Sequence, residues 1–166
     1  SGSDIDGDNL TFSLDSDASS GSVSIVGNIA TYAPSSNTNG DDSFTFMVSD
    51  GELTDTASVA LTITPVNDAP VLDFVDNILL EEDGSATVIL SATDIDSNDL
   101  IFSIQGGDNV TITLDGSEVT FSAPANFNGS EVFTIIVTDG ELIDEQILIV
   151  MVSEINDAPV ATAGLS

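Results

Sequence analysis

The hydrophobic positions of this chain alternate with polar positions at a period of two over much of its length. Runs with this spacing lie at residues 10–14, 44–48 and 59–63. Such alternation is typical of strands that bury one face and expose the other. No segment has the 3.6-residue period of an amphipathic helix. The pattern therefore predicts an all-β protein.

The same pattern occurs twice along the chain. Segments 67–71 and 156–160 both read NDAPV, an offset of 89 residues, and DGEL occurs at the same offset at 50–53 and 139–142. Self-similarity at a fixed period indicates repeats of one module. We predict an incomplete module at 1–66, a complete module at 67–156, and a linker with the start of a next repeat at 157–166.

Turn signals and apolar runs divide the second module into short strands. About seven strands in an 89-residue unit is the number found in immunoglobulin-like sandwiches. Two-residue turns are expected at Gly27-Asn28 and Asp115-Gly116. Ser1 aligns with Ser91, so the first module lacks its two opening strands: either the chain is a piece of a longer array, or those strands come from elsewhere. The predicted strands of the second module are 86–93, 100–105, 110–114, 118–122, 131–138 and 144–153, with an earlier one within 71–82.

Charge narrows the chemistry that is available. The chain has 29 acidic residues, no Lys, Arg, His, Cys or Trp, and a formal net charge of −29. Cationic contacts to nucleic acid or to anionic membranes are therefore excluded, as are His-dependent nucleophiles, His or Cys zinc sites and disulfides. No apolar run is long enough for a membrane span, so membrane insertion is not expected. The oxygen ligands that remain are those preferred by Ca²⁺.

Several ordered motifs resemble the cadherin-like repeat. They are Glu82-Asp83, the ATDID segment at 92–96, the LIFS segment at 100–103, the FTIIVTDG segment at 133–140 and the NDAP linker. The variant with NDAPV linkers is similar to tandem repeats of large secreted bacterial adhesins and biofilm proteins. The resemblance implies two tandem immunoglobulin/cadherin-like Greek-key β-sandwiches at the cell surface or outside the cell, with Ca²⁺ at the junctions between modules.

Carried over by position, the resemblance assigns metal ligands to each junction. The glutamate that the family uses on the upstream side of the internal junction would precede Ser1, so that site is expected to be incomplete. Asp42 and Glu131 are candidates to replace an acidic motif of animal cadherins that has no clear match. The implied ligands are Asn67, Asp68, Asp94, Asp96 and Asp139 for the internal junction, Glu82, Asn156 and Asp157 for the next one, and Asp4, Asp6 and Asp50 for an upstream one.

The spacing of the acidic residues agrees with metal binding but has a simpler reading as well. Aspartates at i and i+2 place two carboxylates around one cation when the chain curls, and Ca²⁺ needs six to eight oxygens. Asp and Asn also form ordinary turns, and Asp-Gly is a common hairpin signal. The DIDGD segment at 4–8 is not an EF-hand loop, because its glycine is misplaced and position 12 is not glutamate.

The outward positions of the second module are more apolar than those of the first. If the sheet order is immunoglobulin-like, six of these side chains form an exposed stripe, which indicates an interface; a covering loop or a strand parity that is wrong by one residue is the alternative. The six predicted interface residues are Ile101, Val132, Ile136, Ile147, Ile149 and Met151.

These observations favour a calcium-binding structural or adhesive repeat whose partners are neighbouring repeats of the same protein. A filament subunit that uses strand addition and the apolar stripe is one alternative. A Ca²⁺-dependent carbohydrate-binding module with surface glycans as partners is another, although the chain has no Trp and one Tyr for stacking. An enzyme is not expected, because the acidic residues repeat with the module instead of forming one cleft.

Overall fold

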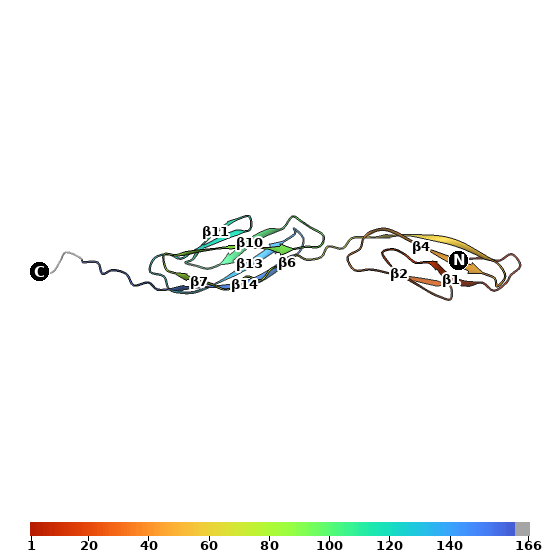
Figure 1. Ribbon diagram of the computed structural model, residues 1–166, viewed down its shortest axis with the longest axis horizontal. Helices are drawn as coiled ribbons and strands as arrows, with labels where there is room; N and C mark the ends of the chain where they lie inside the picture. Colours follow the sequence, from red (N-terminus) through yellow and green to blue (C-terminus); the bar gives the residue numbers. More distant parts are fainter. Residues whose placement is uncertain (162–166) are drawn as a thin grey trace. The chain divides into compact units, whose positions relative to one another are not determined.

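The structure is a computed structural model that describes residues 1–161, so residues 162–166 of the predicted linker lie outside the described part. Every regular element in that part is a β-strand, and no helix there is long and apolar enough to cross a membrane. The chain divides into two compact units, Ser1–Val66 and Asn67–Ser166. We call them unit 1 and unit 2 and describe each by itself (Figure 1).

Unit 1 consists of one three-stranded sheet and one hairpin. The sheet has the order β1-β4-β5 with antiparallel pairing, and β2 pairs with β3. Gly27 begins the β2–β3 turn with a φ of 62°, as expected for a glycine-first two-residue hairpin loop. The strands are β1 (Thr11–Ser16), β2 (Gly21–Val26), β3 (Ile29–Pro34), β4 (Gly40–Ser49) and β5 (Thr54–Ile63).

Unit 2 contains the counterparts of these five strands and four more. Its larger sheet has the order β10-β13-β14-β7, in which β7 is parallel to β14. Its second sheet has the order β11-β12-β8, and the short strands β6 and β9 pair separately. The strands are β6 (Val71–Leu72), β7 (Ile78–Glu81), β8 (Ser85–Ile89), β9 (Ala92–Thr93), β10 (Ile101–Gly106), β11 (Thr111–Asp115), β12 (Glu118–Ser122), β13 (Gly129–Thr138) and β14 (Ile143–Ser153).

The core of unit 2 lies between its two sheets. Phe133 on β13 and Phe121 on β12 are fully buried and meet edge to face, with ring centroids 5.3 Å apart. On β14, Leu148, Val150 and Val152 are buried and the residues between them face outward. The period-two pattern is therefore the direct cause of the sandwich, and the prediction of an all-β fold is confirmed.

The core of unit 1 is more open, because the described residues of this unit include no counterparts of β7 and β8. Phe44 is buried, but Phe46 and Val59 are only half-buried, whereas their counterparts Ile135 and Leu148 are fully buried. An apolar groove lined by Phe12, Phe44, Phe46 and Val59 remains. Among the described residues, the strands of unit 1 are thus the counterparts of β10–β14.

Three details of the predicted strands were wrong. The strand expected at 86–93 is two strands, because the backbone leaves β8 at Leu90, whose N–H donates to the carbonyl of Ser117, and then enters β9. The early strand within 71–82 is divided in the same way into β6 and β7. The β11–β12 turn is Gly116-Ser117, because Asp115 pairs with Glu118.

Candidate functional site

The loop after β9 carries the first two predicted ligands of unit 2. Asp94 Oδ1 accepts the backbone N–H groups of Asp96 and Ser97, both at 2.7 Å, so the carboxylate itself curls the chain. Asp94 Oδ2 is buried and has no hydrogen-bond donor among the described residues. A buried carboxylate oxygen without a partner carries a desolvation cost. A cation at this position would remove that cost.

The linker residues lie against the same pole of unit 2. Asn67 Nδ2 donates to Asp139 Oδ2 at 2.8 Å, and the N–H of Asp68 donates to Asp96 Oδ2 at 2.8 Å. Asp139 lies in the turn between β13 and β14, and its Oδ1 accepts the N–H groups of Glu141 and Leu142 in the same turn. The structure therefore brings all five residues predicted for this junction to one end of unit 2.

Hydrogen bonds hold the pKa of Asp139 below its usual value. The N–H of Leu142 is the largest cause, followed by the amide of Asn67 and the N–H of Glu141. Asp50, the counterpart in unit 1, also has a lowered pKa, caused first by the N–H of Leu53. Both side chains are consequently anionic at neutral pH, which is the state that a cation requires.

The oxygen atoms at this pole are of the chemical type that a hard cation binds. It offers the carboxylates of Asp68, Asp94, Asp96 and Asp139 and the amide oxygen of Asn67, all of them oxygens of the class that Ca²⁺ binds. In the described residues, however, no three acidic side chains are already gathered in a metal-binding arrangement. The residues are instead paired through backbone and amide N–H donors, so these pairs would have to rearrange for an ion to be held.

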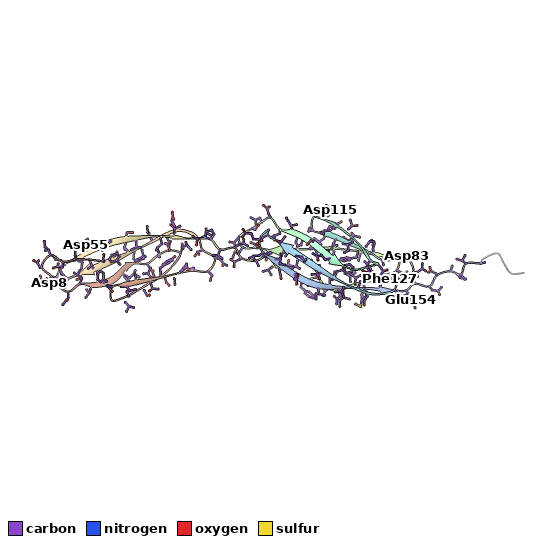
Figure 2. All side chains as sticks on the ribbon, turned by 180° about the vertical axis from the view of Figure 1, so that it is seen from behind. Asp8, Asp55, Asp83, Asp115, Phe127 and Glu154 are labelled. Carbon is purple, nitrogen blue, oxygen red and sulfur yellow. The ribbon has the colours of Figure 1, made fainter. Side chains whose placement is uncertain are left out.

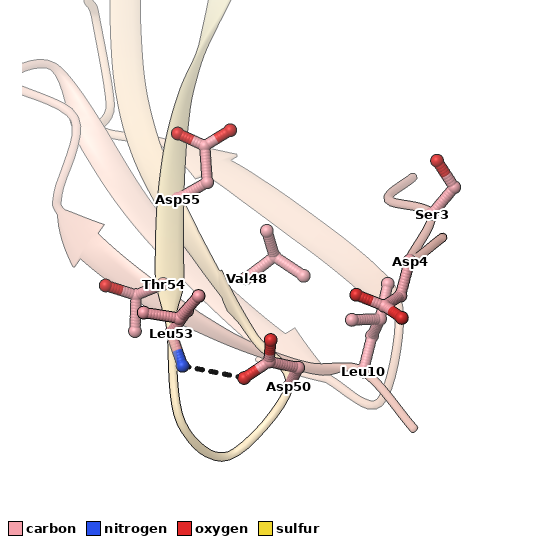
Figure 3. A pocket seen from close by; sticks show the side chains of 8 residues that line it. All are labelled: Ser3, Asp4, Leu10, Val48, Asp50, Leu53, Thr54 and Asp55. Carbon is pink, nitrogen blue, oxygen red and sulfur yellow. Dashed lines mark hydrogen bonds between the residues drawn. The ribbon is translucent and has the colours of Figure 1, made fainter. Parts of the chain in front are cut away.

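The predicted ligands of unit 1 also lie at one end of that unit. Asp4 Oδ1 accepts the N–H groups of residues 6, 7 and 8, and Asp50 Oδ1 accepts those of residues 52 and 53. Asp4 and Asp50 line one pocket together with Asp55 (Figure 3). Asp8 and Asp55 mark the same end of the unit in Figure 2. The three predicted ligands of this repeat, Asp4, Asp6 and Asp50, therefore lie at the same end of it.

Glu82, Asn156 and Asp157 lie at the other end of unit 2. Glu82 is buried, and its Oε1 accepts the N–H of Ile155 at 2.5 Å, directly before Asn156. The Nδ2 of Asn156 donates to the carbonyl of Asp157 at 3.3 Å. The glutamate and the linker that the resemblance pairs are thus neighbours in space.

Asp42 and Glu131 accept hydrogen bonds from neighbouring loops. Asp42 accepts the N–H groups of Ser19 and Ser20 and the hydroxyl of Tyr32, at 2.9–3.0 Å. Glu131 accepts both nitrogens of Asn109 at 2.7–2.8 Å and the N–H of Val110 at 2.9 Å. Their oxygens are engaged by the loop before the β2 or β11 strand. Each carboxylate therefore fixes its own loop.

These hydrogen bonds predict a loss of stability in acid. They lower the pKa of Asp42, first through the N–H of Ser19, and that of Glu131, where the N–H of Val110 and the side chain of Asn109 outweigh the effect of burial. A carboxylate with a lowered folded-state pKa contributes stability that is complete above its unfolded pKa of about 4 and is lost as the pH falls through the folded-state value.

We expect Asp42→Asn to lower the melting temperature at pH 7 and the difference from the unchanged chain to shrink steadily below pH 4. Circular dichroism melts from pH 7 to pH 2 measure this difference. Asp115→Asn, at the exposed end of β11, is the matched control and should differ little in melting temperature from the unchanged chain. A difference for Asp42→Asn that is as large at pH 2 as at pH 7 would contradict the assignment.

The outer face of the larger sheet of unit 2 carries the predicted apolar stripe. The order β10-β13-β14-β7 places the six residues on neighbouring strands, with Val132 paired to Ile149 and Ile147 paired to Thr134. Ile147 is 67% exposed, whereas Ile136 and Ile149 are half-buried. Leu79 on β7, paired to Met151 and 75% exposed, extends the stripe and was missed because β7 was not delimited.

The interface at this stripe stays a prediction with a direct test. Replacing Ile147 and Ile149 with Ser should abolish self-association of the chain, because the two side chains are central to the apolar area. Analytical ultracentrifugation at several concentrations measures the effect, with Thr56→Ser and Ser58→Ala on β5 of unit 1 as the control. An unchanged sedimentation profile for the Ile147/Ile149 variant would count against the interface.

These features define a class of protein, namely tandem immunoglobulin-like sandwiches with acidic residues gathered at strand ends. The model of the bacterial Ig domain matches residues 1–62 and 67–150, so the chain belongs to the bacterial Ig domain family. No curated protein matches the chain significantly.

Several solved structures are similar to this chain, and the protocadherin match supports the fold. Human protocadherin-24 EC1-2 is 15% identical, with a TM-score of 0.56, over 93% of this chain and 86% of that one. The match to domains 1–6 of the surface layer protein SbsC has 21% identity and a TM-score of 0.44, and covers 92% of this chain and 20% of that one. An endo-fucoidan hydrolase of glycoside hydrolase family 107 has 20% identity and a TM-score of 0.45, and this chain, 91% covered, spans 24% of its length.

Proposed function

We propose that this chain is a calcium-binding structural repeat of an extracellular, cell-surface or matrix protein. The observation that carries the proposal is the pole of unit 2, where Asn67, Asp68, Asp94, Asp96 and Asp139 converge. There Asp94 Oδ2 is buried without a hydrogen-bond donor among the described residues. Membership in the bacterial Ig domain family supports an extracellular and non-enzymatic role, since such domains are typically carried by extracellular proteins.

The electrostatics of the chain support the same proposal. A net charge of −29 has no compensating side chain, and like charges at one pole repel each other and strain the compact state. A bound Ca²⁺ would supply two positive charges and a set of open coordination positions for oxygen. Anionic Asp94, Asp96 and Asp139 could then lie close together.

Each residue has a distinct part in this mechanism. The Asp94 turn is already curled by its own hydrogen bonds, so it presents Oδ2 and the Asp96 carboxylate from one rigid loop. Asp139 is anchored by its turn. Asn67 and Asp68 bring the linker onto this surface, and their fixation would stiffen the chain that enters unit 2.

The alternatives have weaker support. A carbohydrate-binding module needs an aromatic platform, but the chain has no Trp, and its one Tyr donates its hydroxyl to Asp42. A strand-addition filament would need a partner for the open edges of unit 1.

The proposal is tested by thermal unfolding of the whole chain with Ca²⁺ and with a chelator. Because an ion that binds only the folded state stabilises it by mass action, the melting temperature should rise with Ca²⁺ concentration. Mg²⁺ at the same ionic strength is the control and should have a much smaller effect. A melting temperature that does not change with Ca²⁺ concentration would refute the proposal.

A further inference from the structure

The first two strands of unit 2 belong to different sheets, and the segment between them is irregular. β6 pairs with β9, whereas β7 pairs in parallel with β14. Figure 1 shows β6 and β7 toward opposite ends of unit 2. Residues 73–77 therefore cross from one sheet to the other without the regular pairing of a strand.

Two side-chain amides fasten this crossing segment to β14. Val75 is buried, and its N–H donates to Gln146 Oε1 at 3.0 Å while its carbonyl accepts from Gln146 Nε2 at 2.6 Å. Because a carboxamide offers a donor and an acceptor side by side, Gln146 serves Val75 as the backbone of a neighbouring strand would. Asn77 Oδ1 accepts the N–H of Ile149 at 3.0 Å. The pairing with β14 thus continues through the break.

The fastened contact is longer than β7 itself. On the upstream side, the N–H of Leu72 donates to Asp144 Oδ2 at 2.9 Å. On the downstream side, the four residue pairs of β7 and β14 end with Glu81 opposite Ser153. Residues 72–81, which we call the strap, therefore follow β14 over most of its length.

Tension on unit 2 would load this contact along its whole length. The chain enters the unit at Asn67, at one end, and leaves β14 after Ser153, at the other. Because the strap and β14 run parallel, a pull on these two points draws them in opposite directions along their common axis. All the hydrogen bonds between them then resist together, instead of opening one after another from one end.

We propose that Gln146 and Asn77 make the strap one continuous tension-bearing element, by carrying load across the break between β6 and β7. This inference rests on the proposed structural role, because only a repeat under tension uses such a contact. Gln146 contributes most, since its two bonds lie beside buried Val75, where water competes little for them. The aligned residue of unit 1 is Ala57, so an alanine at this strand position is compatible with the sheet.

Gln146 also has a simpler role, which the test has to separate from this one. A buried backbone N–H and carbonyl need partners in any fold, so Gln146 would serve Val75 even in a protein that never bears tension. The two roles differ in their dependence on pulling direction. Loss of a purely local partner weakens unit 2 whatever the direction, whereas loss of a tension-bearing contact lowers the unfolding force mainly when the strap and β14 are sheared.

Single-molecule force measurements on the full 166-residue chain separate these roles. The chain has no cysteine, so two introduced cysteines are its only thiol attachment points. Val66→Cys with Glu154→Cys shears the strap against β14, whereas Val66→Cys with Leu142→Cys peels it from the start of β14; all three positions are exposed. A chelator is present throughout, so the result does not depend on calcium binding. We expect unit 2 to unfold at a several-fold higher force when sheared than when peeled.

Gln146→Ala should lower the shearing force and leave the peeling force nearly unchanged. The N–H groups of Leu72 and Ile149 keep their own acceptors in this variant, and their hydrogen exchange should become about tenfold faster, because two lost hydrogen bonds let the strap open locally. Glu145→Ala, an exposed neighbour on β14, is the matched control and should change neither measurement. Equal forces in the two directions for the unchanged chain would overturn the proposal, as would a Gln146→Ala variant that loses no shearing force or loses the same fraction in both directions.

Discussion

Phe133→Ala should destabilise unit 2 by about 3–5 kcal/mol, the range for deleting a buried phenylalanine. Phe133 is 0% exposed, and its ring meets Phe121 edge to face in the middle of the core. Because both sheets are held by hydrogen-bonded strands, the surroundings cannot collapse fully into the cavity. Urea unfolding followed by circular dichroism measures the loss.

The matched substitution in unit 1 is Phe44→Ala, and its expected cost is smaller. Phe44 is buried, but it borders the open groove beside half-buried Phe46 and Val59, so less contact is lost and more relaxation is available. Tyr32, the only tyrosine, lies in unit 1, and its fluorescence reports on that unit separately. A cost for Phe44→Ala equal to that for Phe133→Ala would contradict the open core.

The second large effect concerns Asp94→Asn combined with Asp96→Asn. At a Ca²⁺ concentration of 100 times Kd, an ion bound only to the folded state contributes about 2.7 kcal/mol. The double variant removes two of the charges that hold the ion in unit 2, so most of the Ca²⁺-dependent stabilisation of that unit should disappear. Melting curves recorded at matched Ca²⁺ concentrations measure the difference.

The behaviour without Ca²⁺ separates a metal site from ordinary turns. With a chelator present, the double variant should be close to the unchanged chain, since an amide oxygen at position 94 can still accept the turn N–H groups and two repelling charges are gone. Asp115→Asn, at the exposed end of β11, is the control. An equal loss of stability with and without Ca²⁺ would show that the two aspartates only form the turn.

Much of the fold could be predicted because the repeat and the period-two pattern are independent signals that agree. The alternation along 59–63 fixed which side of β5 faces inward, and the aligned β14 buries Leu148, Val150 and Val152 on the expected side. The offset of 89 residues aligned Asp139 with Asp50 from the sequence alone. Linker residues were assigned in the same way, and Asn67 does contact Asp139.

The remainder depended on long-range contacts that a linear pattern does not contain. The departure of the chain from β8 at Leu90 is accompanied by a hydrogen bond to the carbonyl of Ser117 in the β11–β12 turn. The part played by Asp144 depends on Leu72, 72 residues earlier. Leu79 lies in the apolar stripe because β7 pairs in parallel with β14. Each of these features comes from tertiary pairing.

Calorimetric titration of Ca²⁺ into the chelator-treated chain is the most direct test of the central claim. The account predicts saturable binding that persists in excess Mg²⁺, with a lower stoichiometry for Asp94→Asn combined with Asp96→Asn and an unchanged one for Asp115→Asn. A folded chain that shows no saturable binding up to millimolar Ca²⁺, or a double variant that binds as many ions as the unchanged chain, would contradict it.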